Sequence, residues 1–157
     1  MNKIVKITPQ FAVTGALAPA HFALAVSLGF RAVLSNLPDG ELPAAPGSAE
    51  EAELAARAGL GFAHVPLRKG DMDLDAIAEA MFAALGGLKP PVLAHCASGQ
   101  RSALAWGLAA ARRQPVERVL AVLSSAGFAL QPLRGELEAL AVPGTLGAPL
   151  PPALKLG

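Results

Sequence analysis

Short apolar runs alternate with helix-like segments along most of the 157-residue chain. The runs "FAVT", "RAVLSNL", "FAHVPL" and "PVLAHC" are bounded by turn residues, and each is followed by apolar residues at helical spacing. Continuous apolar runs of this length are typical of parallel strands, because helices cover both of their faces. The alternation therefore predicts an α/β fold with a central, mostly parallel sheet and helices on both faces.

The boundaries of these elements can be predicted from turn and cap residues. The expected extended segments are 3–14 with Pro9 at a turn, 31–37, 62–67 and 91–96. The expected helices are 19–28, 49–58, 74–85, 102–113 and one that opens at Pro115 and ends at Gly127. Ser48 and Glu51 fit a capping box before the second helix. We expect one domain over 1–142, and a Pro/Gly-rich tail over 143–157 that wraps the surface or is disordered.

Charge and cysteine content narrow the class of protein. The formal net charge is +1 and Lys and Arg occur at most in pairs, which argues against a nucleic-acid partner. A single cysteine allows neither an intramolecular disulfide nor a cysteine-based zinc cluster, and it fits a reducing cytoplasm. We therefore expect no metal and no cofactor. The oligomeric state stays open, since the 53% hydrophobic composition leaves room for a dimer interface.

One apolar segment has to be tested as a membrane span. Residues 11–30 carry no Asp, Glu, Lys or Arg over a length that can cross a bilayer. Gly15, Pro19, His21 and Gly29 interrupt the segment, so it divides better into a strand and a helix. We therefore expect neither a signal peptide nor a membrane partner.

The only cysteine, Cys96, ends the strand predicted over 91–96, and a helix is predicted to begin at Ser102. Ligands bind beyond the carboxyl ends of strands in open α/β sheets. The loop between these elements contains a glycine, and its backbone N–H groups together with the helix N-terminus form an anion site. The residues expected to bind an oxyanion, phosphate or sulfate, are Ala97, Ser98, Gly99, Gln100 and Arg101.

The same electrostatic field favours the thiolate form of Cys96, which makes it a candidate nucleophile. Arg101 would clamp the oxyanion through its guanidinium, and Ser102 is placed to donate a hydrogen bond to the sulfur. The alternative is a small, inert, buried thiol, the usual state of a lone cysteine in an Ala-rich chain. The glycine-containing loop, the arginine and the following helix favour the nucleophile.

The segment "HCASGQRS" resembles the signature loop of cysteine-dependent phosphatases. Together with "ITPQFAVTGALAPAHFALAVSLGFRAVLSNLPDGE" and "HCASGQRSALAWGLA", it resembles the bacterial beta-lactamase-hydrolase-like family in its phosphatase-like domain, over residues about 4–130. The resemblance implies a three-layer sandwich like that of dual-specificity phosphatases. It also implies hydrolysis of a phosphate monoester through a phosphocysteine. Some members of the family are labelled sulfurtransferases.

Two positions depart from the phosphatase pattern. Protein tyrosine and dual-specificity phosphatases place five residues between the cysteine and the arginine, whereas four separate Cys96 from Arg101. The shorter spacing is similar to the rhodanese loop and is shared by members of the resembled family. Leu37 stands in the "NLPDGE" turn where the family commonly has Arg, so that positive charge is missing.

A general acid is needed to protonate the leaving alkoxide of a phosphate ester. Lys69 stands where the resemblance places an Asp, and Asp71 is the nearest carboxylate, with Asp73 behind it. Helix N-capping is the alternative role for both aspartates. Asp39 and Glu41 follow the second strand and can also face the loop, where Asp39 would contact substrate. Their alternative is an ordinary Asp-Gly turn.

The three histidines are interpreted as structural. His95 points away from Cys96 and is expected to orient the loop through hydrogen bonds. His64 and His21 have no partner at metal-ligand spacing, and Trp106 is expected in the core.

Three functions remain open at this point. A cysteine-dependent phosphatase is favoured by the resemblance. A sulfurtransferase acting through a Cys96 persulfide is favoured by the loop length and by the missing acid at Lys69. A non-catalytic module that binds an oxyanion is also favoured by that missing acid.

Overall fold

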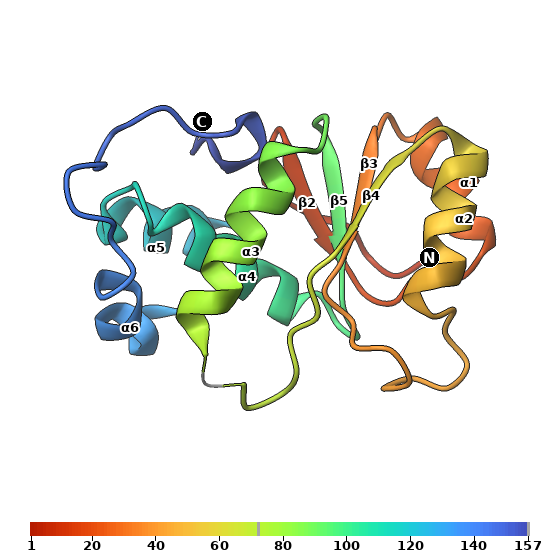
Figure 1. The fold of residues 1–157 in the computed structure, drawn as a ribbon, viewed down its shortest axis with the longest axis horizontal. Helices are drawn as coiled ribbons and strands as arrows, with labels where there is room; N and C mark the ends of the chain where they lie inside the picture. Colours follow the sequence, from red (N-terminus) through yellow and green to blue (C-terminus); the bar gives the residue numbers. More distant parts are fainter. Residues whose placement is uncertain (72, 157) are drawn as a thin grey trace.

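A five-stranded sheet lies at the centre of the computed structural model, which describes residues 1–71 and 73–156 (Figure 1). The strands are β1 (Val5–Thr8), β2 (Phe11–Thr14), β3 (Ala32–Ser35), β4 (Gly61–His64) and β5 (Val92–His95). Their order in the sheet is β1-β2-β5-β3-β4. β1 pairs antiparallel with β2, and the remaining pairs are parallel. The predicted mostly parallel sheet is confirmed.

Helices cover both faces of this sheet (Figure 1). They are α1 (Ala20–Ser27), α2 (Ser48–Ala58), α3 (Leu74–Gly86), α4 (Gln100–Ala110), α5 (Val116–Ser125) and α6 (Arg134–Glu138). On β5, Leu93 packs in the core shared with α1 and α2, whereas Val92 and Ala94 pack in the core shared with α3, α4 and α5. This alternation buries both faces of the central strand and completes the predicted three-layer sandwich.

The first turn of α2 differs from the predicted capping box. The helix begins at Ser48, and Gly47 occupies the N-cap position without a side-chain hydrogen bond. Asp39 supplies the cap instead, because its Oδ1 accepts from the Ser48 N–H at 2.7 Å and its Oδ2 accepts from the Ser48 hydroxyl at 2.8 Å. The capping-box prediction was wrong because an acceptor nine residues upstream in the chain reaches the helix terminus.

The segment after Val142 packs against the helices of one layer. It contains a short 3-10 turn over Pro152–Leu154, and the side chains of Ala153 and Leu154 are fully buried. The Trp106 indole donates a hydrogen bond to the carbonyl oxygen of Ala153 at 2.8 Å. The same indole stacks on Phe11, with ring centroids 6.1 Å apart. The expected core tryptophan therefore anchors the last part of the chain to the sheet.

Over residues 1–71 and 73–156, no helix is long and apolar enough to cross a bilayer. The same residues contain no group of three or more His, Cys, Asp and Glu side chains arranged to hold a metal ion.

Candidate active site

The loop that follows β5 lies at the carboxyl edge of the sheet, in its middle. Thr14 of β2 and Ser35 of β3 both pair with His95, so three parallel strands end level with one another. Cys96 comes next, and α4 begins at Gln100. Cys96 to Gly99 therefore form a very short turn, which we call the Cys loop. This is the edge at which open α/β sheets bind ligands.

Cys96 is buried, and its sulfur already has a donor. The Gly99 N–H points at Cys96 Sγ at 3.0 Å, a contact that favours negative charge on the sulfur. Gly99 has φ +94°, and an added Cβ would lie 3.5 Å from the Thr14 backbone. Glycine is needed here because that left-handed conformation lets the chain turn into α4 within four residues.

The start of α4 adds further donors to the Cys loop. Because the helix begins at Gln100, the N–H groups of its first turn have no carbonyl partner within the helix. They carry the partial positive charge of the helix N-terminus. Ala97 is half-buried while Ser98 and Gln100 are exposed, so solvent and ligands reach the outer side of the loop.

Arg101 is held by a carboxylate that sequence reasoning considered but did not select. Its Nη1 donates to Glu41 Oε1 at 2.9 Å and its Nη2 to Glu41 Oε2 at 2.5 Å. Nη1 also donates to the Leu67 carbonyl oxygen at 2.7 Å. The two hydrogen bonds from Arg101 lower the pKa of Glu41, and Glu41 in turn raises the pKa of Arg101.

The donors of Arg101 can be counted. A guanidinium has five N–H groups. Glu41 and Leu67 use both N–H groups of Nη1 and one of Nη2. The Nε–H and the second Nη2–H remain, and among the described residues neither has a recorded acceptor. These two groups share one edge of the planar guanidinium, so Arg101 can hold an oxyanion with two hydrogen bonds while Glu41 stays in place.

His95 forms a second buried contact at the other end of the Cys loop. Its Nε2 lies 2.6 Å from Glu51 Oε1, and the two side chains are only 1% and 2% exposed. His95 Nδ1 has no hydrogen-bond partner among the described residues. Sequence analysis missed Glu51 as this partner. The available signal was its spacing from Ala55, because positions i and i+4 share one helix face and that face packs on the sheet.

The aspartates take different positions. Asp73 caps α3, because its Oδ1 accepts from the Ala76 N–H at 3.2 Å. Asp71 lines the same hollow as the Cys loop, and its Oδ1 accepts from the Asp73 N–H at 3.1 Å. Asp39 is turned toward α2, and the hydrogen bonds from Ser48 lower the pKa of Asp39. The structure therefore places Asp71 on the hollow that the Cys loop borders, and it commits both oxygens of Asp39 to the helix cap.

Ser102 lies fully buried in the first turn of α4. Its hydroxyl has no hydrogen-bond partner among the described residues, so the expected bond to the sulfur of Cys96 is not formed. The Gly99 N–H occupies that role in this structure.

The remaining histidines have local partners. His64 Nε2 lies 2.8 Å from the Leu37 carbonyl oxygen. His21 Nδ1 accepts from the Ala18 N–H at 2.8 Å, at the start of α1. Both contacts fit the structural role expected for these side chains.

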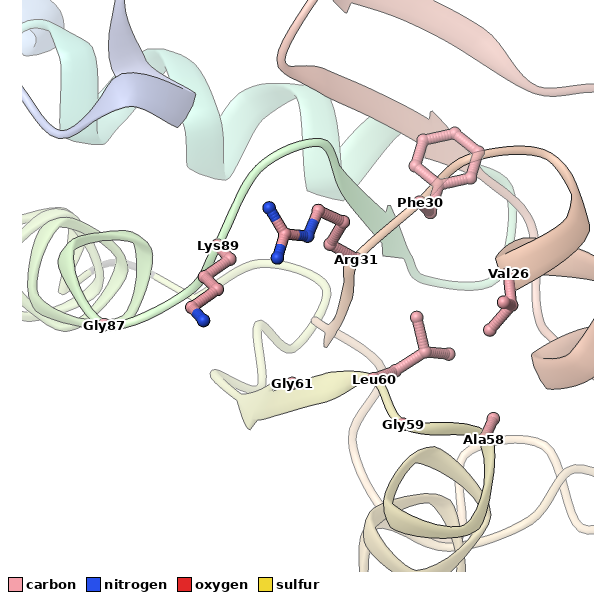
Figure 2. Close-up of a pocket in the computed structure, with 9 residues that line it drawn as sticks. All are labelled: Val26, Phe30, Arg31, Ala58, Gly59, Leu60, Gly61, Gly87 and Lys89. Carbon is pink, nitrogen blue, oxygen red and sulfur yellow. The ribbon is translucent and has the colours of Figure 1, made fainter.

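Hollows border the Cys loop on two sides. One has a volume of about 450 Å³ and is lined by residues 67–71, 97, 98, 100, 101 and 104. The other, of about 750 Å³, shares residues 97, 98 and 100 and extends toward Lys3 and Phe128. A further cavity of about 520 Å³ lies at the opposite edge of the sheet, where Arg31 and Lys89 are among its lining residues (Figure 2). Of these three hollows, the first two border the Cys loop and the third does not.

The fold and the Cys loop define the class of protein. A provisionally assigned phosphatase from Neisseria meningitidis is 29% identical, with a TM-score of 0.70 over 87% of this chain and 97% of that one. The core catalytic domain of a PP-IP phosphatase from S. cerevisiae shares the fold at 14% identity, with a TM-score of 0.59 over 94% of each chain. The fold is that of the cysteine phosphatases.

Residues 3–113 match the family described as "Beta-lactamase hydrolase-like protein, phosphatase-like domain", and the chain belongs to this family. A beta-lactamase hydrolase-like protein of Xylella fastidiosa is 34% identical over 106 residues, which are 68% of this chain and 24% of that protein. Its counterpart in Agrobacterium fabrum is 30% identical over 100 residues, or 64% and 23% of the two chains. The chain thus spans about a quarter of the length of these relatives.

The buried contact between Glu51 and His95 predicts a large effect on stability. Glu51→Ala should lower the free energy of unfolding by about 1–3 kcal/mol, the cost of leaving a buried hydrogen-bonding group without its partner. Urea unfolding measures this loss. The matched control is Glu50→Ala, an exposed neighbour on the same helix that should change stability by less than about 0.5 kcal/mol. Equal losses in the two variants would contradict the assignment.

Proposed function

We propose that the protein is a cysteine-dependent phosphatase, like the protein tyrosine and dual-specificity phosphatases, that hydrolyses a phosphate monoester of a protein or a small molecule through a phosphocysteine. One observation carries the proposal. Cys96, with a backbone N–H on its sulfur, lies five residues before Arg101, which is in the first turn of α4 and whose guanidinium keeps two donors on one edge. A nucleophile and an oxyanion clamp are thereby held together before substrate arrives.

The first step forms the phosphocysteine. The Cys96 thiolate attacks phosphorus in line with the ester oxygen, and the P–O bond to the leaving group breaks. The free edge of Arg101 and the N–H groups at the start of α4 hold the other phosphate oxygens, where negative charge is concentrated. Preorganised donors of this kind need no rearrangement as the reaction proceeds.

The second step regenerates the enzyme. Water attacks phosphorus, the P–S bond breaks, and inorganic phosphate leaves while Cys96 returns as a thiolate. Asp71 is the carboxyl group that we assign to proton transfer, because it lines the hollow in which Cys96's loop and Arg101 lie. Protonated, it donates a proton to the alkoxide that leaves in the first step. Ionised, it takes a proton from water in the second step.

Sulfur transfer is the second candidate, and the four-residue spacing between Cys96 and Arg101 favours it. In that reaction the thiolate takes the outer sulfur of thiosulfate, releases sulfite and becomes a persulfide. No general acid is required. The third possibility, anion binding without turnover, is favoured by Lys69 at the position expected for an acid.

Hydrolysis of para-nitrophenyl phosphate tests the proposed function directly. Cys96→Ser should lose at least about 1,000-fold in kcat, because a hydroxyl at this position lacks the nucleophilicity of a thiolate. Urea unfolding of the variant controls for folding. No turnover by the folded wild-type protein would overturn the phosphatase. In that case, thiocyanate production from thiosulfate and cyanide would support sulfur transfer, and phosphate binding alone would support the non-catalytic module.

The role of Asp71 depends on the leaving group. Asp71→Asn should reduce kcat for an alkyl phosphate by about 100-fold or more, because an alkoxide needs a proton as it leaves. The loss for para-nitrophenyl phosphate should be much smaller, since nitrophenolate leaves without one. Steady-state kinetics on both substrates measure the difference, and Asp75→Asn, an exposed neighbour, is the matched control. An equal loss on the two substrates would remove Asp71 from this role.

Glu41 positions Arg101, and its removal should weaken transition-state binding. Glu41→Gln keeps at most a weaker hydrogen bond to Arg101, so kcat/KM should fall by about 10–100-fold. The variant also has a pH signature. Because Arg101 lowers the pKa of Glu41, the pair stabilises the fold at pH values above the ordinary pKa of a glutamate. That stabilisation is lost as the pH falls through the lowered value.

Urea unfolding across acidic pH should therefore show a steeper loss of stability in the wild type than in Glu41→Gln. Glu50→Gln is the control, because Glu50 is exposed. Unchanged kcat/KM in Glu41→Gln would show that Arg101 reaches its place without Glu41.

A further inference from the structure

Arg68, Lys69 and Arg101 line the hollow beside the Cys loop, so it holds two cations besides the one assigned to clamp the reacting phosphate. Among the described residues, Asp71 is the only carboxylate that lines it. Glu41 already offsets the charge of Arg101 through its two hydrogen bonds. Arg68 and Lys69 therefore outnumber the single carboxylate of Asp71.

The segment that carries these two cations is tied to Arg101. The residue before them, Leu67, is buried, and its carbonyl oxygen accepts from Arg101 Nη1 at 2.7 Å. Arg68 and Lys69 follow directly, are exposed, and line the same hollow as Arg101. A ligand that extends from Arg101 into this hollow therefore shares it with both cations.

Neither cation is neutralised within residues 1–71 and 73–156, where no carboxylate lies within ion-pair distance of Arg68 or Lys69. Their field nevertheless reaches the site, because both help to lower the pKa of Glu41. Cations that only keep a protein soluble have no need to line a cavity. Because Arg68 and Lys69 both line this hollow, solubility alone does not explain their position.

The size and lining of the hollow indicate a small ligand. Its volume of about 450 Å³ lies within the range of small-molecule sites, about 300–1,000 Å³. Its larger apolar side chains are Leu67 and Leu104, and no aromatic ring lines it. A phosphotyrosine ring would find no aromatic partner there, whereas a polar ligand with a second anionic group would find two cations.

We propose that Arg68 and Lys69 form a second anion subsite, and that the substrate is a small phosphate monoester carrying a further phosphate or similar anionic group. The reacting phosphate occupies the Cys loop and the second group lies between Arg68 and Lys69. This inference rests on the proposed function, because the Cys loop defines where the reacting phosphate sits. Charge-assisted hydrogen bonds to the second group then provide specificity as well as affinity.

Binding of two non-hydrolysable probes tests the subsite without turnover. Methylphosphonate carries one anionic group, and methylenebisphosphonate carries two. In metal-free buffer, calorimetry on the wild-type chain should show at least about tenfold tighter binding of the bisphosphonate. In the Arg68→Ala/Lys69→Ala double variant, this advantage should fall to about twofold or less, because the affinity for methylphosphonate should fall much less than that for the bisphosphonate.

The cavity at the far edge of the sheet supplies the control. Lys89 is an exposed lysine of that cavity (Figure 2), so Lys89→Ala should leave both affinities as they are in the wild type. Equal affinities for the two probes would overturn the subsite, as would an advantage that survives the double variant, or binding of neither probe.

The outcome is separable from that of the proposed function. If the protein prefers the bisphosphonate but hydrolyses no phosphate ester, the proposed subsite is supported and the proposed phosphatase activity is wrong. If the protein hydrolyses para-nitrophenyl phosphate but binds both probes equally, the proposed phosphatase activity is supported and the proposed subsite is wrong.

Discussion

Two carboxylates from one stretch of chain hold the two ends of the Cys loop. Glu51 contacts His95, immediately before Cys96, and Glu41 contacts Arg101, just after the loop. Both carboxylates follow β3, one from the turn and one from α2, so a single segment of about ten residues braces the site. Asp39 secures that segment in turn, because it caps α2 through Ser48. The geometry of the anion site therefore depends on a turn and a helix that contribute no donor to the anion.

These contacts explain how a short loop can remain preorganised. Burying charged or polar groups is costly unless each finds a partner, and breaking one partner leaves the other unsatisfied. The contact at His95 is almost completely buried, whereas Arg101 and Glu41 stay partly open to solvent. The first suits a structural brace, and the second suits a group that must also meet a ligand. The two contacts differ in exposure because their side chains lie at different places relative to the sheet edge.

Some of this arrangement could be predicted from particular residues. Cys96 and Gly99 lie in the Cys loop and Arg101 lies in the first turn of α4, so their proximity follows from sequence distance alone. Asp73 as a helix cap and Trp106 as a core residue also follow from local pattern. Ser48 as a cap failed because Asp39, nine residues away, competes for the same terminus. The sequence also predicts Glu51 as part of that capping box, whereas its side chain is buried and contacts His95 at the end of β5.

The sequence by itself determined the layered α/β fold and the position of the Cys loop. Apolar periodicity and turn residues act over a few neighbours, and both features depend on such local preferences. Only the tertiary structure decided which carboxylate meets Arg101, which meets His95, and which cations border the loop. Those choices join residues 28 to 60 positions apart, and many carboxylates satisfy the same chemical requirement. The packing of α2 and the β4–α3 connection against the sheet edge selects among them, because it sets which side chains come within hydrogen-bond distance.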